Sequence, residues 1–372
     1  MKVQVLQENL SKTLNTCSRF ASSRVQLPVL ANILFKTNKN KLLIAATNLE
    51  ISIAISIGAK VVKEGELTVP ARTITDIVTN LTPGQIDLEV EKELLKVTTP
   101  SFESSLMGMN AADFPSIPYD LGLDSLTIPA KDLVNALDCV LFAVSLDETR
   151  PTLTGVLILL REKEIVFVAT DGFRLSQKKI AVSGVKEEKK MILPKNALSE
   201  LLKLAADSDD VKFSFKKAEN QVVFGISDSI LATRVIEGEF PPYEKIIPTD
   251  LKVKLVLDKE EFLRAVKLAS VFAKDAANVV KLSIGSDVLE VFAESSQSGS
   301  QKAKVDAKVD GVKDKDSQLT VAFNYRFLED FLNAVKSDDV QMEFSNPNAP
   351  ALFLDPKDTN FLHIIMPVRL QS

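Results

Sequence analysis

Residues Leu126–Leu137 read Leu-Thr-Ile-Pro-Ala-Lys-Asp-Leu-Val-Asn-Ala-Leu. The first residues form a short extended segment, and the proline suits a first helical turn. The apolar residues Leu133, Ala136 and Leu137 then follow at helical spacing. The stretch therefore predicts a strand that runs directly into a helix.

The same pattern recurs along the whole chain. Copies of it begin at residues 3, 67, 126, 191, 255 and 319. The copies at Leu67 and Met191 keep the proline, those at Val3 and Leu255 lack it, and the copy at Leu319 is looser. Each copy opens a stretch close to one sixth of the 372 residues, which indicates six related units.

Short apolar runs follow the helices. After the third helix they occupy 153–160, 165–170 and 173–182, and the turn pair Asp171-Gly172 separates the last two. Such runs, partly β-branched and bounded by turn residues, predict strands and hairpins. We therefore expect an α+β fold in which each unit is a strand, a helix and about three further strands.

Proline-marked links close each pair of units. Asp113-Phe114-Pro115 is matched by Glu239-Phe240-Pro241, and Pro367 follows at the same spacing. We therefore expect three similar domains, over residues 1–118, 125–248 and 252–372. Residues 295–316 are rich in Ser, Lys and Asp with few apolar anchors, and we expect them to form a mobile loop between strands.

Composition is that of an ordinary globular protein, with 45% hydrophobic and 26% charged residues. Cys17 and Cys139 fall in predicted helices without metal-ligand spacing, which favours buried thiols in a reducing compartment. The first residues do not resemble a signal peptide, and the longest apolar run, near 156–160, is far short of a membrane span. We expect a cytoplasmic protein without membrane contact.

The sequence offers no recognisable catalytic or cofactor site. His363 is the single histidine and lies on a predicted strand, so the usual zinc sites cannot form and a surface or hydrogen-bonded sheet histidine is expected. Phosphate-binding, dinucleotide-binding and nucleophile-elbow motifs are absent. Asp171-Gly172 is better explained as a hairpin turn than as a catalytic carboxylate. We expect no enzyme activity and no cofactor.

Basic residues are the remaining candidates for chemistry on the helices. The net charge of −5 argues against a tight nucleic-acid binder but permits a local positive surface. Because the units repeat, their outer helical faces should be equivalent. The basic residues on or beside the predicted helices are Lys12, Arg19, Arg24, Arg72, Arg150, Lys195, Arg264, Lys267 and Lys274.

Together the repeats and several phrases resemble one family, the bacterial sliding clamp, the β subunit of DNA polymerase III. The phrases are Thr68–Arg72, Asn110–Pro115, Arg150–Gly155, Ala169–Leu175, Glu237–Pro241 and Met366–Leu370. The likeness covers the whole chain. It implies three similar domains per chain and a head-to-tail homodimeric ring, with helices inside and sheets outside.

The resemblance also implies a non-catalytic function. Such a ring encircles duplex DNA without sequence preference and tethers the replicative polymerase, and an ATP-driven loader opens it. DNA held by topology needs only weak phosphate contacts, which is compatible with an acidic chain. Of the basic residues, Arg24, Arg72, Arg150 and Lys195 are the ones we expect to face DNA.

The family binds short partner peptides rich in Gln, Leu and Phe, including those of the polymerase α subunit and the clamp loader, in an apolar cleft between the second and third domains. The resemblance assigns to it Leu153, Thr170, Gly172, Phe173, Arg174, Leu175, Pro241, Ile246, Val340, Met366, Pro367, Val368, Arg369 and Leu370. Apolar walls would accept Leu and Phe, while backbone and arginine groups fix the polar end.

Two departures from the family bear on this cleft. Phe173 stands where His or Tyr is common, so peptide preference should shift toward apolar residues. Gln371 and Ser372 extend past the usual Arg-Leu ending. The subunit boundary is expected at Leu106 of one chain against Val271 and Phe272 of the other.

Two other classes stay open at this point. A metal-dependent hydrolase or nuclease would need carboxylates that converge in a cleft, and the sequence selects none. A monomeric peptide-binding scaffold could be built from the same repeats. A strictly monomeric mass at high concentration would favour the scaffold.

Overall fold

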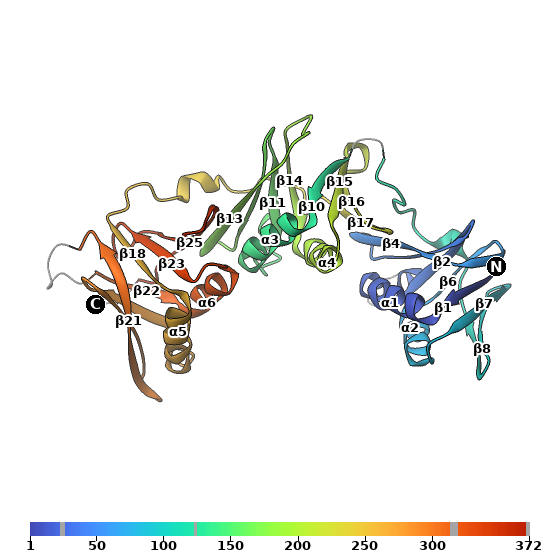
Figure 1. Cartoon of the computed structure of the whole chain (residues 1–372), viewed down its shortest axis with the longest axis horizontal. Helices are drawn as coiled ribbons and strands as arrows, with labels where there is room; N and C mark the ends of the chain where they lie inside the picture. Colours follow the sequence, from blue (N-terminus) through green and yellow to red (C-terminus); the bar gives the residue numbers. More distant parts are fainter. Residues whose placement is uncertain (23–26, 123–124, 313–318, 370–372) are drawn as a thin grey trace. The chain divides into compact units, whose positions relative to one another are not determined.

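The computed structural model describes residues 1–22, 27–122, 125–312 and 319–369 (Figure 1). Six helices each begin directly after a strand, so the predicted strand–helix repeat is confirmed. They are α1 Gln7–Cys17, α2 Ala71–Asn80, α3 Ala130–Val140, α4 Lys195–Ala205, α5 Lys259–Ala273 and α6 Tyr325–Ala334. Pro70 caps α2 with φ −53° and ψ 116°, one residue earlier than the predicted first turn. An extended ψ lets the proline end the strand, while its fixed φ still suits the helix entry.

The chain forms two compact units, each made of two segments. The first unit comprises Met1–Lys131 with Glu200–Val235, and the second comprises Asp132–Ser199 with Ile236–Ser372. Every sheet lies within one unit.

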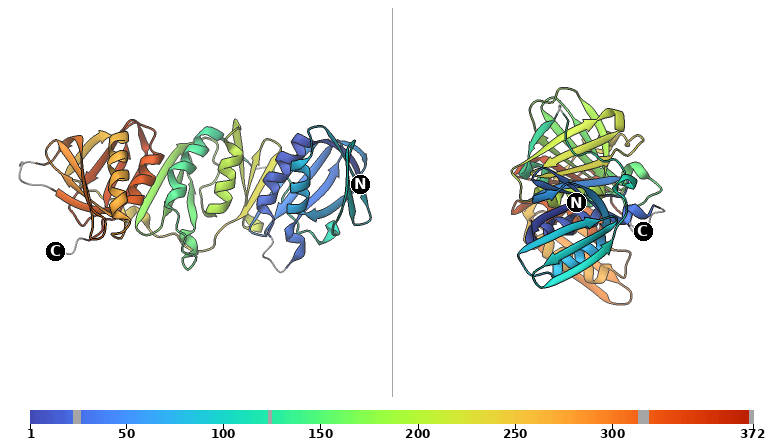
Figure 2. Two further views of the ribbon diagram at one scale, coloured as in Figure 1. Left: turned by 90° about the horizontal axis from the view of Figure 1, so that it is seen from below. Right: turned by 90° about the vertical axis from the view of Figure 1, so that its right-hand side faces the viewer.

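The first unit contains two antiparallel sheets. The smaller has the order β5 (Lys60–Lys63), β1 (Lys2–Leu6), β7 (Gln85–Glu91), β8 (Leu94–Thr99) and β9 (Phe102–Met107). The larger has the order β10 (Leu126–Pro129), β15 (Asp210–Lys216), β16 (Gln221–Ile226), β17 (Ser229–Arg234), β4 (Ile51–Gly58), β3 (Lys41–Thr47), β2 (Asn32–Asn38) and β6 (Glu66–Pro70). Helices α1 and α2 lie side by side (Figure 2) and are joined where Gln7 Nε2 donates to the Val78 carbonyl at 2.8 Å.

The second unit is built on one twelve-stranded antiparallel sheet. Its first strands are β14 (Lys189–Pro194), β11 (Gly155–Leu160), β12 (Glu164–Thr170), β13 (Arg174–Ala181), β25 (Asp358–Ile365) and β24 (Ala351–Asp355). The order continues through β23 (Asp339–Phe344), β18 (Val253–Asp258), β21 (Gly299–Asp310), β20 (Val288–Ser295), β19 (Val279–Ile284) and β22 (Leu319–Asn324). Edge-to-face aromatic contacts of Phe323 and Phe331 with Phe353 help fill its core.

The predicted loop at 295–316 is wrong for most of its length. Residues Gly299–Asp310 form β21, a strand of 12 residues that pairs with β20 and then with β18. The less exposed positions of β21 alternate through Ala303, Val305 and Ala307. Because most of these inward side chains are small and their neighbours are Lys and Asp, the alternation of apolar and polar residues in the sequence is weak. Long-range pairing fixes the strand. Residues 313–318 lie outside the described residues.

Two turns in the chain have the same hydrogen bonds. In the first, Thr47 Oγ1 donates to the Ile51 carbonyl at 3.0 Å and accepts from Leu49 N at 3.0 Å. In the second, Thr170 Oγ1 donates to the Arg174 carbonyl at 2.6 Å and accepts from Gly172 N at 3.1 Å. Gly172 has φ +93°, and Leu49 occupies the corresponding position with φ +77°. Leucine is strained in this left-handed region, whereas glycine is not.

Leu49→Gly is therefore expected to raise the free energy of unfolding by about 1 kcal/mol, through relief of left-handed strain. Urea unfolding at neutral pH measures the change. Leu49→Ala is the matched control, because it shortens the same exposed side chain but keeps a Cβ atom at positive φ. Equal unfolding midpoints for the two variants would contradict the strain assignment.

Candidate functional site

The turn between β12 and β13 presents Phe173 to solvent. Asp171 Oδ1 accepts hydrogen bonds from Phe173 N at 2.9 Å and from Arg174 N at 3.0 Å. With Gly172 at positive φ, this is the tight turn that the sequence predicted. The Phe173 residue that it holds is 61% exposed.

The C-terminal segment runs along this turn. Arg174 pairs with Ile365 of β25, and Met366 N then donates to the Phe173 carbonyl at 2.8 Å. Val368 N donates to the Ala322 carbonyl at 2.8 Å. Met366 and Val368 are 37% and 38% exposed. The structure thus places two apolar C-terminal side chains on a backbone that is fixed beside Phe173.

An apolar core lies beneath this edge. Of the predicted cleft residues, Leu153 and Leu175 belong to it and are buried, together with Leu157, Val166, Val168, Ile192, Phe240, Tyr243, Leu352 and Ile364. Ile246 ends the short helix η7 (Tyr243–Ile246) and is 40% exposed. Pro241, just before it, also lines a pocket of about 620 Å³ beside β11 and β14. Buried leucines therefore underlie a rim of exposed apolar residues.

The Arg174 side chain is only 10% exposed and is already bonded within the chain. Its Nε donates to Asp171 at 3.0 Å, Nη1 to Asp330 at 2.5 Å, and Nη2 to the Phe142 carbonyl at 2.6 Å. The ring of Phe327 lies 4.5 Å from the guanidinium carbon. All three nitrogens are thus engaged. The geometry gives Arg174 a positioning role, in which it holds the turn against α6. Its contact with the polar end of a peptide stays a prediction.

One predicted cleft residue, Val340, is not part of this edge. Val340 is fully buried on β23, where it pairs with Leu257. In the sheet order, β24 and β25 separate β23 from β13, so Val340 belongs to the core instead. Its apolar character suits either place, which is why sequence alone did not separate them. Leu370 lies outside the described residues.

The predicted DNA-facing residues have different environments. Arg72, in the first turn of α2, is exposed and lies 3.9 Å from Asp76. Arg150 pairs with Asp147 at 2.9 Å. Its Nη1 also lies beside Gly172, because a Cβ atom added to this glycine would be 3.1 Å from that nitrogen. Burial lowers the pKa of Lys195, and the positive charge of Arg174 lowers it further. Arg72 is therefore the freest of the three, and Arg24 lies outside the described residues.

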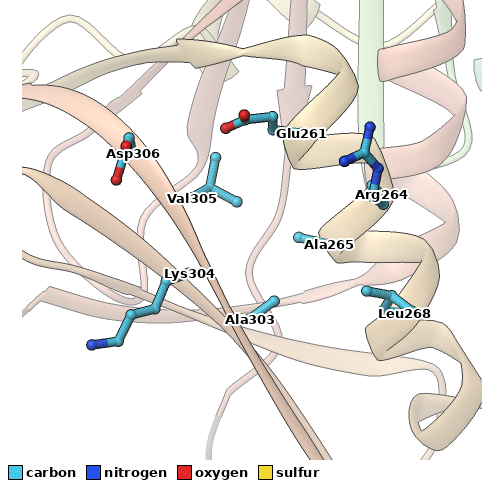
Figure 3. A pocket seen from close by; sticks show the side chains of 8 residues that line it. All are labelled: Glu261, Arg264, Ala265, Leu268, Ala303, Lys304, Val305 and Asp306. Carbon is cyan, nitrogen blue, oxygen red and sulfur yellow. The ribbon is translucent and has the colours of Figure 1, made fainter.

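The residues proposed for a subunit boundary lie on an edge strand and a helix. Leu106 is buried on β9, at the edge of the five-stranded sheet, and its neighbour Met107 is exposed. On α5, Val271 is exposed and Phe272 partly buried. In the second unit, a pocket of about 350 Å³ lies between α5 and β21 (Figure 3). Its lining residues are Glu261, Arg264, Ala265, Leu268, Ala303, Lys304, Val305 and Asp306.

His363 is a buried sheet histidine. Its Nδ1 lies 2.6 Å from Ser176 Oγ, and its ring stacks on Phe331 with centroids 5.5 Å apart. Burial, followed by the charge of Arg174, lowers the pKa of His363 well below its ordinary value. The hydrogen bond between Ser176 and His363 thus joins β13 to β25 within the core.

This histidine predicts a pH dependence. Because the pKa of His363 is lower in the folded chain than in the unfolded chain, the unfolded chain takes up a proton first as the pH falls below about 6.5. The stability that neutral His363 contributes is therefore present above that pH and is lost below it. Between pH 7.5 and 5.5, the free energy of unfolding should fall by about 1.3 kcal/mol more for the natural chain than for His363→Gln. Urea unfolding at both pH values measures this difference. An equal fall in both proteins would contradict the assignment.

The described residues show no sign of a metal site or a membrane span. Within the described ranges, no three His, Cys, Asp or Glu side chains gather as a metal ion would require. No helix in those ranges is long and apolar enough to cross a membrane. Cys17 and Cys139 are buried as predicted, and burial raises the pKa of both thiols.

Family profiles match almost the whole chain. The profiles of the N-terminal, central and C-terminal domains of the DNA polymerase III beta subunit match residues 1–118, 127–242 and 244–369. The beta sliding clamps of Staphylococcus aureus and Staphylococcus epidermidis are 31% and 30% identical to this chain, with 99% of each chain covered.

Solved structures show the same fold. The DNA polymerase sliding clamp from Bacillus subtilis has a TM-score of 0.94 at 26% identity, and the DNA polymerase III beta subunit from Thermotoga maritima a TM-score of 0.90 at 25% identity. Both comparisons cover all of each chain. The fold therefore defines a three-domain DNA-clamp type of protein. The chain belongs to the DNA polymerase III beta subunit family.

Proposed function

We propose that this chain is a non-catalytic sliding clamp of the cytoplasm, which encircles duplex DNA and tethers the replicative polymerase. The observation that carries the proposal is the match of all three family domains, in order, along residues 1–369. Tethering keeps the polymerase at a high effective concentration near its template, so rebinding becomes intramolecular. Primer extension with the cognate polymerase and loader tests it. Longer products per binding event are expected, and unchanged product length would contradict the proposal.

We propose further that two chains close head to tail into a ring, with domains over 1–118, 125–248 and 252–372. Two features support this closure. The first is that β9 is the edge strand of its sheet. The second is that residues Gly299–Asp306 of β21 pair with β20 on one side, whereas β18, on the other side, pairs only with the remaining residues of β21. Edge strands are ready to extend a sheet across a boundary. The exposed Met107, Leu268 and Val271 would supply apolar contact there.

The cleft for partner peptides is proposed at the edge formed by Phe173, Ile246, Met366 and Val368. These four apolar side chains are exposed, while Leu153 and Leu175 are buried in the apolar core beneath the turn. The hydrogen bond from Met366 N to the Phe173 carbonyl fixes the C-terminal segment beside that turn. A peptide with Leu and Phe would cover apolar surface that is otherwise in water. Partners of this chemistry include the polymerase α subunit and the clamp loader.

Binding to DNA is proposed to depend on topology more than on affinity. The chain carries a net charge of −5, and exposed basic side chains lie on α2 (Arg72) and on α5 (Arg264 and Lys267). Weak phosphate contacts of this kind are sequence-independent and salt-sensitive, and they permit sliding.

A further inference from the structure

The first compact unit contains a second copy of the edge that forms the proposed cleft. Helix α1 and strands β2, β3 and β4 correspond to α3, β11, β12 and β13 with one constant shift in residue number. Gln7 thus corresponds to Ala130, Asn32 to Gly155, and Ile51 to Arg174. We call the edge beside Glu50 in the first unit the first junction, and the edge beside Phe173 in the second unit the second junction.

The backbone pairing at the two junctions is the same. At the second junction, Arg174 pairs with Ile365, and Met366 N donates to the Phe173 carbonyl at 2.8 Å. At the first junction β4 pairs with β17 so that Ile51 lies opposite Thr233, and Arg234 N donates to the Glu50 carbonyl at 3.0 Å. Glu50 therefore occupies the place of Phe173, and Arg234 that of Met366.

The apolar layer beneath is also repeated. The first junction lies over a buried cluster of Val29, Leu30, Leu34, Ala45, Ala54, Phe114 and Ile117. In this cluster Leu30 corresponds to Leu153, and Phe114, one residue before Pro115, corresponds to Phe240. The first junction thus has the floor as well as the backbone of the proposed cleft.

The exposed rim is where the two junctions differ. The second junction presents Phe173, Ile246 and Met366 to solvent, and all three are apolar. Glu50 and Arg234 correspond by strand pairing, and Asp120 corresponds to Ile246 because it follows Phe114 by six residues as Ile246 follows Phe240. All three residues are exposed and charged. A Leu or Phe side chain laid over these groups would strip water from charges without replacing their hydrogen bonds.

We propose that Glu50, Asp120 and Arg234 exclude apolar partner peptides from the first junction and so limit each chain to one partner. This inference rests on the proposed function of the second junction. With one cleft per chain, partners compete for the same place and exchange there, instead of binding side by side on one chain.

Exchange of the rim tests this inference. The natural chain and the variant Glu50→Phe/Asp120→Ile/Arg234→Met are titrated with a fluorescein-labelled synthetic peptide that contains Gln, Leu and Phe. Isothermal titration calorimetry gives the stoichiometry. The natural chain should bind about one peptide per chain and the variant about two, since the three substitutions complete a second apolar rim. All three residues are exposed, so the thermal midpoint should stay unchanged and report an intact fold.

A second variant removes a further difference between the junctions. Leu49 stands where the second junction has Gly172, and its side chain is exposed. Leu49→Gly is therefore added to the three rim substitutions. Binding of about two peptides by either variant supports the inference. Binding of one peptide by both variants, with thermal midpoints no lower than that of the natural chain, overturns it, as does binding of two peptides by the natural chain.

Phe173→Glu separates the two sites. In the natural chain it should weaken peptide binding at least about 10-fold, because it places a charge in the apolar rim of the second junction. In the four-substitution variant it should leave about one peptide bound, at the first junction. Loss of all binding there would overturn the inference. Failure of the natural chain to bind any peptide would instead refute the proposed cleft, which is a distinguishable result.

Discussion

Phe272→Asp is expected to split the assembled protein into single chains of 40.8 kDa. Phe272 is partly buried on α5 next to the exposed Val271, and both lie near the pocket between α5 and β21. A carboxylate in an apolar subunit contact is left without a partner, and we expect the dissociation constant to rise at least about 100-fold. Light scattering across a dilution series measures the mass. The natural chain should weigh about 82 kDa, twice one chain, by head-to-tail closure.

Two further variants control this experiment. Leu146→Asp places the same charge on a leucine that is 84% exposed in another part of the second unit, and it should leave the mass unchanged. Val271→Asp changes an exposed residue and tests the contact without disturbing the packing of Phe272. Phe272→Asp and Val271→Asp proteins that both stay at the two-chain mass would remove this face of α5 from the subunit boundary.

Removal of Met366–Ser372 is expected to abolish binding of partner peptides and to leave the assembled mass unchanged. The deletion takes away Met366 and Val368, two of the exposed apolar side chains at the rim, and with them the hydrogen bond to the Phe173 carbonyl. Loss of a rim and its backbone support should weaken binding at least about 100-fold. Fluorescence anisotropy with a labelled peptide that contains Gln, Leu and Phe measures the affinity.

The matched control for this deletion removes only Gln371 and Ser372, which follow the rim residues. This shorter deletion should keep peptide affinity. Affinity that survives the removal of Met366–Ser372 would show that the cleft assignment is wrong, because no C-terminal side chain would then be needed.

Local pattern and chain repetition were enough to predict the strand–helix units. The helix that follows Leu126–Pro129 begins at Ala130, as apolar spacing predicted, because that periodicity reflects a buried face. The turn at Asp171-Gly172 was also predictable, since the residue types that adopt it are few. These features depend on interactions between residues close together in sequence.

Features that depend on distant residues were not predicted. Strand β21 has weak alternation of its own and is fixed by β20 on one side and β18 on the other. The three bonds of Arg174 reach Asp171, Phe142 and Asp330, and only the first is close in sequence. No local signal shows that an arginine makes these contacts within its own chain. The contact of Arg174 with a partner peptide stays a prediction.

The candidate cleft itself was assigned through the family resemblance, and it stays a prediction. Leu153 and Leu175 are buried in the core beneath the proposed cleft, while Phe173, Ile246 and Met366 are exposed. Sequence pattern alone could not separate Val340 from these, because an apolar residue on a strand suits a core as well as a cleft. The comparison of Phe173 with Glu50 at the first junction was available from the repeats, but only the strand pairing shows that the two are equivalent.

The most direct test of the account is retention on circular DNA. The chain, radiolabelled and loaded by its cognate loader onto nicked circular duplex, is separated from free protein by gel filtration, and the DNA is then cut once. A ring held by topology should stay on the circle at moderate salt and slide off after linearisation, because it has no tight grip on phosphates. Equal retention on circular and linear DNA would contradict encirclement and point to direct binding instead.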